Sequence, residues 1–218
     1  MRTNALLRSV AYGVIINIVE REYMAICHFS IGHISRSTGR SAVQAAAYIT
    51  GSCLYETRRD LTANYENRAG DVVWSKTFAP EWAPAEFHEL SVWDKLETFE
   101  DEYAIERYPN SIEARDKYAD SARTALTYIV ALPRELPSDV SIELITAFVE
   151  ERFLTQGLII TAAMHDDEGN PHAHLQISRR SVEADGTFSW AKNRSMCTKK
   201  ELLSARKMFV DFTGYYIT

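Results

Sequence analysis

The sequence has few cysteines and no hydrophobic segment long enough to cross a membrane. Its three cysteines, Cys27, Cys53 and Cys197, are an odd number, lie far apart and include no CxxC pair. That pattern is typical of a reducing compartment and offers no thiolate metal site. The main apolar stretch near the start, residues 10–19, is much shorter than the roughly 20 residues that span a bilayer. We therefore expect a cytoplasmic protein without membrane insertion.

Repeats and low-complexity tracts are also absent, and the composition is that of an ordinary globular protein. Hydrophobic residues make up 46% of the 218 residues, charged residues 25% and aromatic residues 11%. These values argue against a disordered chain. Because domains usually contain about 100 to 200 residues, one compact domain is the simplest expectation.

Basic residues are too few to outnumber the acidic ones, but the charges are unevenly distributed. The net charge is −6. Residues 1–60 carry seven Lys/Arg and four Asp/Glu (+3), residues 61–164 nine and nineteen (−10), and residues 165–218 eight and seven (+1). A pair of solvated acidic helices explains the middle, and the two ends remain able to face a polyanion.

Hydrophobic patterning predicts an α+β protein in which helices flank a mostly antiparallel central sheet. Helices are expected over residues 41–50, within 85–122, over 137–157 and over 199–212. Strands are expected over residues 24–31, 72–78, 125–132, 158–164 and 173–178. The polar segments 32–39 and 55–71 are expected to be irregular. Segment 166–171, Asp-Asp-Glu-Gly-Asn-Pro, has the composition of a turn and predicts a hairpin between the last two strands.

Three of the six histidines, His165, His172 and His174, fall within ten residues around this turn. Alternate residues of a strand share a face, so His172 and His174 point the same way and the hairpin returns His165 beside them. Three imidazoles from adjacent strands offer a facial set of nitrogen ligands and leave positions for water or a phosphate oxygen. The spacing therefore predicts a catalytic metal site, although any one of these histidines alone would more often be a polar residue near a turn. The acidic residues 166–168 are expected mainly to solvate the turn.

The segment around these histidines resembles a motif of a known family. Gly169–Leu175, Gly-Asn-Pro-His-Ala-His-Leu, is similar to the His-hydrophobe-His motif of MobA/MobL-type conjugative relaxases. A set of segments near the start resembles the beginning of the same family, especially its TraA-like branch: Met24–Ser30, Ile34–Ser37, Gly39–Val43 and Ala45–Tyr48. Ala131–Leu136 resembles a third family segment. The resemblance runs in order from Met24 to about Arg194.

The resemblance implies a fold and an activity. The fold is that of the His-hydrophobe-His endonuclease superfamily, and the activity is metal-dependent nicking of one DNA strand at an origin of transfer during conjugative mobilisation. The enzyme stays attached to the new 5′ end through a phosphotyrosine. Tyr48 matches that nucleophile, whereas its place on an alanine-rich helix would by itself predict packing in the core. The implied ion is Mg²⁺ or Mn²⁺, although three imidazoles would also suit Zn²⁺ or another transition metal.

The implied partners are single-stranded DNA at an origin of transfer, relaxosome accessory proteins and a type IV secretion coupling protein. Phosphate contacts dominate the binding of single strands. Four arginines near the candidate nucleophile suit such contacts, although ordinary surface solvation is an equal alternative for each: Arg36, Arg40, Arg58 and Arg59. Tyr55 and Tyr65 are less favoured nucleophiles than Tyr48.

The resemblance also divides the chain. Residues 1–23 are expected to be an extension outside the match, residues 24–194 the nicking domain, and residues 195–218 a C-terminal helix that is truncated relative to the family. Relatives carry acidic residues on the strand before the Ala-Leu-Pro segment, whereas this chain has none over 127–130, Thr-Tyr-Ile-Val. A module that binds an origin without cutting it is therefore one alternative. A rolling-circle replication initiator and a metal hydrolase that uses water in place of tyrosine are two others.

Overall fold

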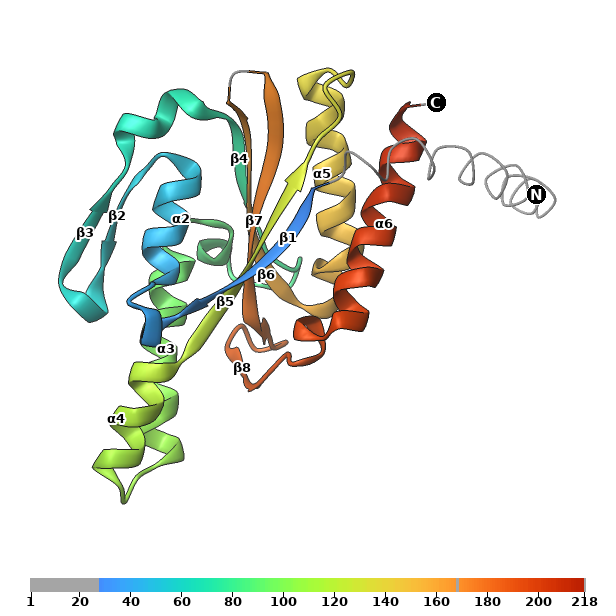
Figure 1. The fold of residues 1–218 in the computed structure, drawn as a ribbon. Helices are drawn as coiled ribbons and strands as arrows, with labels where there is room; N and C mark the ends of the chain where they lie inside the picture. The colour runs from blue at the N-terminus through green and yellow to red at the C-terminus, as the bar shows by residue number, and fades with distance from the viewer. Residues whose placement is uncertain (1–27, 168, 218) are drawn as a thin grey trace.

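A computed structural model describes residues 28–167 and 169–217 as a sheet with helices on both faces (Figure 1). The predicted extension 1–23, the start of the expected strand 24–31, Cys27 and Glu168 lie outside the described residues. The sheet contains, in spatial order, β1 (Phe29–Ser35), β5 (Arg123–Ala131), β7 (Asn170–Val182), β6 (Leu158–Asp167) and β4 (Val72–Phe78), with β8 (Phe188–Lys192) paired to β7. All of these pairings are antiparallel. The predicted α+β class with an antiparallel sheet is confirmed.

The helices form a layer on each face of the sheet. α5 (Ser138–Arg152) and α6 (Lys199–Ile217) cover one face, and α2 (Ala42–Thr50) and α3 (Val92–Arg107) lie on the other (Figure 1). α4 (Ile112–Ser121) follows α3 and extends beyond one end of the sheet. None of the described helices is long and apolar enough to cross a membrane.

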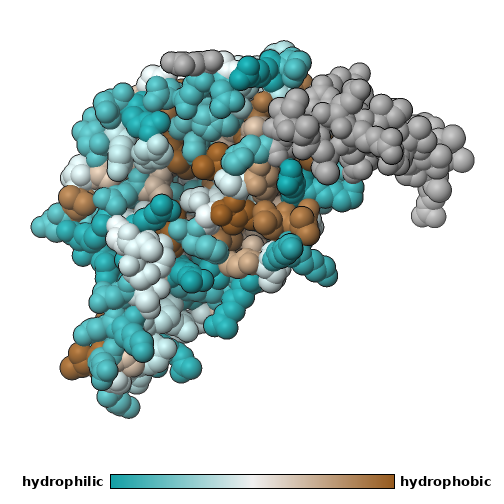
Figure 2. Space-filling view, in the orientation of Figure 1, coloured by the Kyte–Doolittle hydropathy of each residue, from teal (hydrophilic) through white to brown (hydrophobic). Residues whose placement is uncertain are grey.

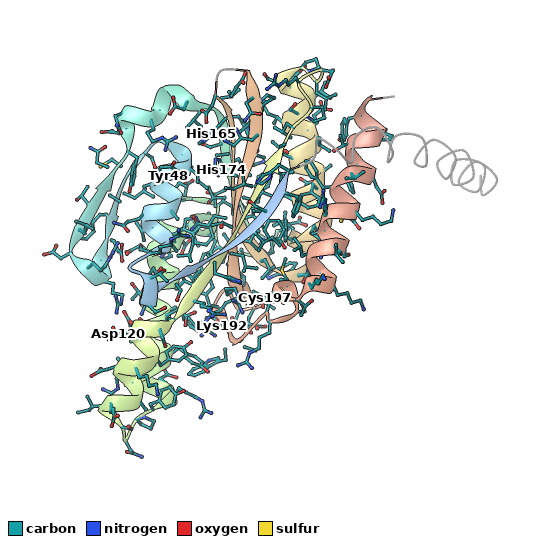
Figure 3. The ribbon with its side chains drawn as sticks, viewed as in Figure 1. Tyr48, Asp120, His165, His174, Lys192 and Cys197 are labelled. Carbon is teal, nitrogen blue, oxygen red and sulfur yellow. The ribbon has the colours of Figure 1, made fainter. Side chains whose placement is uncertain are left out.

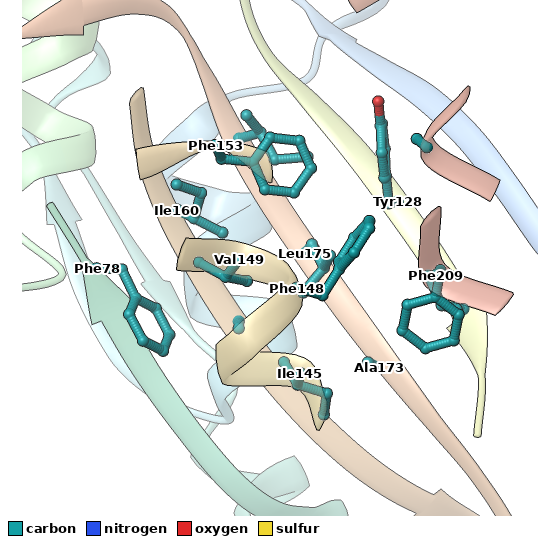
Figure 4. Packing of buried hydrophobic residues seen from close by; sticks show 14 of the residues in the cluster. Phe78, Tyr128, Ile145, Phe148, Val149, Phe153, Ile160, Ala173, Leu175 and Phe209 are labelled. Atoms are coloured by element: carbon teal, nitrogen blue, oxygen red, sulfur yellow. The ribbon is translucent and has the colours of Figure 1, made fainter. Parts of the chain in front are cut away.

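The larger apolar core lies between the sheet and the pair α5 and α6. Tyr128 and Leu175 on neighbouring strands pack against Phe148, Phe153 and Phe209 (Figure 4). The rings of Phe148 and Phe209 meet edge to face with centroids 5.2 Å apart, an arrangement that aromatic pairs prefer. Apolar side chains also gather at the surface over β1 and α6 (Figure 2). This core joins α6 to the sheet, so residues 199–217 pack as part of the same unit.

The predicted helix over 41–50 is confirmed as α2, and local chemistry sets both of its ends. Alanine dominates its sequence, and the Ser41 side chain caps the first turn by accepting from the backbone amides of Val43 and Gln44. Gly51 ends it in the left-handed conformation with φ +59°. A Cβ on Gly51 would lie 2.6 Å from the Ala69 Cα. Glycine is thus required both for the turn and for the close approach of the segment that carries residues 66–71.

Two segments predicted to be irregular contain strands, so those predictions are wrong. Residues 32–35 continue β1, because Gly32 leaves room for the Thr127 side chain on β5 where a Cβ would lie 2.6 Å from its hydroxyl oxygen. Residues 53–64 form a separate hairpin of β2 (Cys53–Glu56) and β3 (Leu61–Asn64). These strands are four residues long, too short for a hydrophobic period to predict them.

The interpretation of α3 as a solvated acidic helix is wrong for two of its glutamates. Glu97 and Glu100 are both 0% exposed. Glu97 pairs with Arg36 at 2.8 Å, and Glu100 pairs with Arg180 at 2.8 Å. Buried carboxylates are rare unless they are paired, and here the partners come from η1 (Arg36–Thr38) and β7, both distant in sequence.

Candidate metal centre and nucleophile

Three imidazoles converge on the α2 side of the sheet, and we call His165, His172 and His174 the histidine centre. His165 on β6 is directly opposite His172 on β7. Ala173 faces the opposite side and belongs to the core under α5 and α6, as strand alternation requires. One nitrogen from each ring can be chosen so that all three lie within 4.8 Å of one another. The structure therefore brings the three predicted ligands together.

Hydrogen bonds to two backbone carbonyls fix which ring nitrogens remain available. Nε2 of His165 lies 2.7 Å from the Ile49 carbonyl, so it donates its proton there and leaves Nδ1 as the lone-pair nitrogen. Nδ1 of His172 lies 2.9 Å from the Asn170 carbonyl, which leaves Nε2 available by the same logic. Backbone carbonyls commonly orient metal-binding histidines in this way.

The available nitrogens suit a divalent ion. Nδ1 of His165 is buried and has no partner among the described residues. Nε2 of His172 and Nε2 of His174 lie 3.1 Å apart, close to the separation of about 3.0–3.4 Å expected for two nitrogens each about 2.1 Å from one ion. An orphaned nitrogen beside such a pair is what a metal would satisfy. The three residues therefore fit the metal that was predicted from their spacing.

The surroundings lower the pKa of two of these imidazoles, those of His165 and His174, and so favour the uncharged form that a metal ligand needs. Burial is the main cause that lowers the pKa of His174 to about 3, and the nearby His165, His172 and Arg68 lower it further. Burial also lowers the pKa of His165, although its hydrogen bond to Ile49 opposes that shift. Asp167, one of the acidic turn residues, has a carboxylate oxygen 3.9 Å from Nε2 of His172 and is half exposed.

Tyr48 on α2 lies beside the histidine centre, on the same side of the sheet as His165 and His174 (Figure 3). The next residue, Ile49, supplies the carbonyl that His165 contacts. Tyr48 is 38% exposed, so the core packing expected from its helix alone is not what the structure shows. Its ring meets that of Tyr65 edge to face at 5.5 Å.

Arg68 is a candidate site residue that the sequence did not reveal. Its guanidinium carbon lies 4.1 Å from the centroid of the Tyr48 ring, a cation–π contact. Partial burial would lower the pKa of Arg68, but interactions with Tyr48 and Asp71 outweigh it and raise that pKa. The close approach at Gly51 holds the backbone before Ala69 against α2 and so sets this contact. No sequence spacing rule connects residues 48 and 68. Only the close approach of their two segments at Gly51 could have suggested that Arg68 contacts Tyr48.

The four arginines predicted to bind DNA lie in different environments. The Arg36 side chain is only 4% exposed, and its guanidinium pairs with Glu97 and Asp101. A phosphate contact would require it to leave those partners. Arg58 pairs with Asp101 and Arg59 with Glu56. Arg40 is exposed. Of the four arginines, Arg40 is therefore the best suited to a phosphate contact at the surface, whereas Arg36 is held in ion pairs within the fold.

The strand beside the histidines places no acid where relatives were expected to carry one. Ile129 on β5 is directly opposite His174, and Thr127 is opposite Gln176. Gln176 donates to the Ala42 carbonyl at the start of α2. The polar support of the centre therefore comes from backbone carbonyls, with Asp167 as the nearby acid.

Comparisons with known proteins agree on one family. The model of the MobA/MobL family matches residues 40–212, which extends past the expected limit at residue 194 and includes most of α6. The chain is 36% identical to the conjugal transfer protein TraA of Agrobacterium fabrum over 75% of its own length and 14% of that protein. It is 33% identical to the probable mobilization protein MobA of Bifidobacterium longum over 78% of its length and 27% of that protein.

A solved structure shares the fold. It comes from work on the molecular basis of vancomycin resistance transfer in Staphylococcus aureus, and it aligns with a TM-score of 0.72 at 23% identity, covering 88% of this chain and 92% of that one. The chain spans only a small part of the curated relatives that it matches, between 14% and 45% of their lengths.

Proposed function

The chain belongs to the MobA/MobL family, and from that premise we propose that it carries the nicking activity of a conjugative relaxase, cutting one DNA strand at an origin of transfer. The observation that carries this proposal is an exposed tyrosine, Tyr48, beside three imidazoles whose free nitrogens face one another. A tyrosine next to a metal site suits phosphoryl transfer to the protein, whereas water alone would suffice for hydrolysis.

The proposed reaction is a transesterification in which the number of phosphoester bonds is conserved. The Tyr48 oxygen attacks the scissile phosphorus and loses its proton, the bond from phosphorus to the 3′ oxygen breaks, and that oxygen takes up a proton. The product is a 5′-phosphotyrosine and a free 3′ hydroxyl, which can attack the phosphotyrosine later and rejoin the strand. A divalent ion, when bound, would polarise the phosphate and offset the charge that develops on it.

The side chains of this chain then have distinct roles. His165, His172 and His174 would hold the ion, and the carbonyls of Ile49 and Asn170 would orient the first two rings. Arg68 would keep the Tyr48 ring in place and supply a permanent positive charge near the phosphate. The same proposal includes single-stranded DNA, relaxosome accessory proteins and a type IV secretion coupling protein as partners.

The test is covalent capture of DNA. The protein would be incubated with Mn²⁺ and labelled single strands that tile the DNA beside its gene, and the products separated on a denaturing gel. We expect one strand to give a slower protein–DNA band that Tyr48→Phe abolishes. Tyr65→Phe is the matched control because its ring contacts that of Tyr48, and it should retain the band.

Other results would replace the proposal with a specific alternative. Cleaved DNA that is free of protein and persists in Tyr48→Phe would indicate a hydrolase. Tight binding without any cleavage would indicate an origin-binding module. Ile129 beside His174 is the observation that favours this second candidate, since an acidic residue there is absent.

A further inference from the structure

The chain that follows β5 lies at the same end of the sheet as the histidine centre. Ala131, the last residue of β5, is directly opposite His172 on β7. The Leu132 amide donates to the Pro171 carbonyl at 2.9 Å, which keeps the chain beside the start of β7. Pro133 comes next and cannot continue the strand pairing, because proline has no N–H. The chain therefore leaves the sheet next to the histidine centre.

A cavity of about 650 Å³ lies at this point, and its volume is typical of ligand-binding pockets, which measure about 300–1,000 Å³. His172 and the neighbouring Asp167 both line it. Ile129 and Ala131 also line it, and they lie on the histidine face of the sheet because they are directly opposite His174 and His172. The cavity therefore adjoins the histidine centre and shares His172 with it.

The lining of the cavity combines an apolar wall with a polar rim. Leu132 contributes to the wall, together with Phe209 and Val210 of α6, and all three are buried. Because α6 covers the other face of the sheet, the cavity extends around the sheet's end. Arg134 and Glu135 line it as well and are exposed, so it opens to solvent between charged side chains. Pockets for organic ligands commonly have this composition.

The rim offers both donors and acceptors to a ligand. Within residues 28–167 and 169–217, neither the Arg134 nor the Glu135 side chain takes part in a hydrogen bond or an ion pair. A guanidinium only donates and a carboxylate only accepts. Asn170, another lining residue, uses its backbone carbonyl for His172, and its side-chain amide adds one group of each kind. A flat apolar molecule with donors and acceptors along its edge would match this cavity.

We propose that the cavity binds the base of a nucleotide next to the nicked phosphate. The inference deepens the proposed function and rests on it, because it assumes that a DNA phosphate lies at the histidine centre. The faces of a base suit the apolar wall, and its edge carries the groups that arginine, asparagine and glutamate bind. Since His172 belongs to both sites, a nucleotide beside the phosphate at the centre is the one placed to enter.

The test measures how strongly DNA binding depends on single bases. The DNA is the tiled strand that the chain binds most tightly, and the covalent adduct of the wild type maps its nick. Bases near the nick are removed one at a time to leave abasic positions, and binding is measured by fluorescence anisotropy. All binding proteins carry Tyr48→Phe, so that no adduct forms and binding alone is observed.

Two variants change the cavity and each has a matched control. Val210→Trp fills the cavity from α6, and Leu203→Trp adds the same ring at an exposed position of that helix outside the lining. Arg134→Gln removes the positive charge from the rim. Arg194→Gln is its control, because Arg194 is exposed and lies near Cys197, away from the histidine centre (Figure 3).

With the cavity intact, removal of one base next to the nick should weaken binding about tenfold, within the range that one bound base contributes. In Val210→Trp the same removal should have no further effect, because the ring already excludes the base. Arg134→Gln should reduce the effect of base removal. Leu203→Trp and Arg194→Gln should retain it in full.

Two results would overturn the inference. One is a folded Val210→Trp protein that is as sensitive to base removal as Leu203→Trp. The other is an Arg134→Gln protein that binds intact and abasic strands with equally reduced affinity, which would assign a contact to the DNA backbone. Arg134 is exposed, so this variant decides the question even if Val210→Trp does not fold. The covalent band of the protein that retains Tyr48 tests the proposed function separately.

Discussion

Two polar clusters lie on the α2 and α3 side of the sheet, and they differ in how completely their groups are paired. In the ion-pair cluster, Glu97 holds Arg36, and Glu100 holds Arg180 together with Lys192. In the histidine centre, the buried Nδ1 of His165 has no partner among the described residues, and the half-exposed Asp167 carboxylate lies 3.9 Å from Nε2 of His172. The charges of the first cluster are paired with one another, whereas the second leaves a ring nitrogen unused.

The difference separates a structural role from a functional one. Buried charges that satisfy each other fix the relative positions of helices and strands, and Glu100 does so between α3 and β7. Groups that are left unsatisfied raise the free energy of the ligand-free protein, and binding recovers that free energy. One face of the sheet therefore carries both the ion-pair cluster, whose charges are paired, and the histidine centre, which keeps an unpaired nitrogen.

The largest expected effect on the unfolding free energy comes from removing one partner of the ion-pair cluster. Glu100→Ala would leave Arg180 buried without its carboxylate, and the loss of one partner of a buried pair costs about 3–5 kcal/mol of unfolding free energy. Urea unfolding at pH 7 measures it. The triple variant Glu100→Leu with Arg180→Met and Lys192→Met should recover much of the loss, because well-packed apolar residues can replace a buried charge cluster as a whole. A single variant as stable as the wild type would mean that the pair is not buried in solution.

An intermediate effect is expected when the histidine centre is titrated in the presence of a chelator. The pKa of His174 is about 3 in the folded protein against an ordinary value of 6.5. Below pH 6.5 the unfolded state therefore binds a proton that the folded state does not, so the unfolding free energy falls as the pH falls. The loss is about 1.4 kcal/mol per pH unit, or about 2 kcal/mol at pH 5, and it is absent above pH 6.5.

The control for this titration is a variant that lacks the His174 imidazole. His174→Gln cannot take up the proton, so its urea midpoint should fall less steeply between pH 7 and pH 5 than that of the wild type. Equal slopes in the two proteins would show that His174 titrates normally when folded. Added Mn²⁺ should raise the wild-type urea midpoint at pH 7 without flattening the slope, since a bound ion keeps protons off the folded state only.

The two clusters also differ in how far the sequence could predict them. The histidine spacing on either side of a turn was enough to predict that three rings converge, because strand alternation and a hairpin are local rules. The ion-pair cluster was not predictable, because Arg36 and Glu97 are 61 residues apart and only the tertiary fold joins them. Arg36 was consequently predicted to contact DNA, although its partners are carboxylates.

The fold shows the same limit. Long apolar strands such as β5 and β6 and the capped helix α2 follow from local patterns, and the structure confirms them. The hairpin of β2 and β3 does not follow from such a pattern. The extension of β1 through Ser35 also escaped prediction, since it depends on pairing with β5 across about ninety residues. Contacts between distant segments decide these elements.

The smallest expected effect on stability concerns Arg68, which belongs to neither cluster completely. It has a weak partner in Asp71 at 3.4 Å and a cation–π contact with Tyr48. Arg68→Ala should lower the unfolding free energy by only about 0.5–1 kcal/mol, the worth of an exposed cation–π contact. If Arg68 positions Tyr48 and supports the phosphate, the same variant should slow adduct formation far more than that change implies. Arg68→Lys keeps the charge but not the planar fork. Its rate of adduct formation should therefore lie between those of the wild type and of Arg68→Ala. An Ala variant with the wild-type rate would place Arg68 with the structural residues.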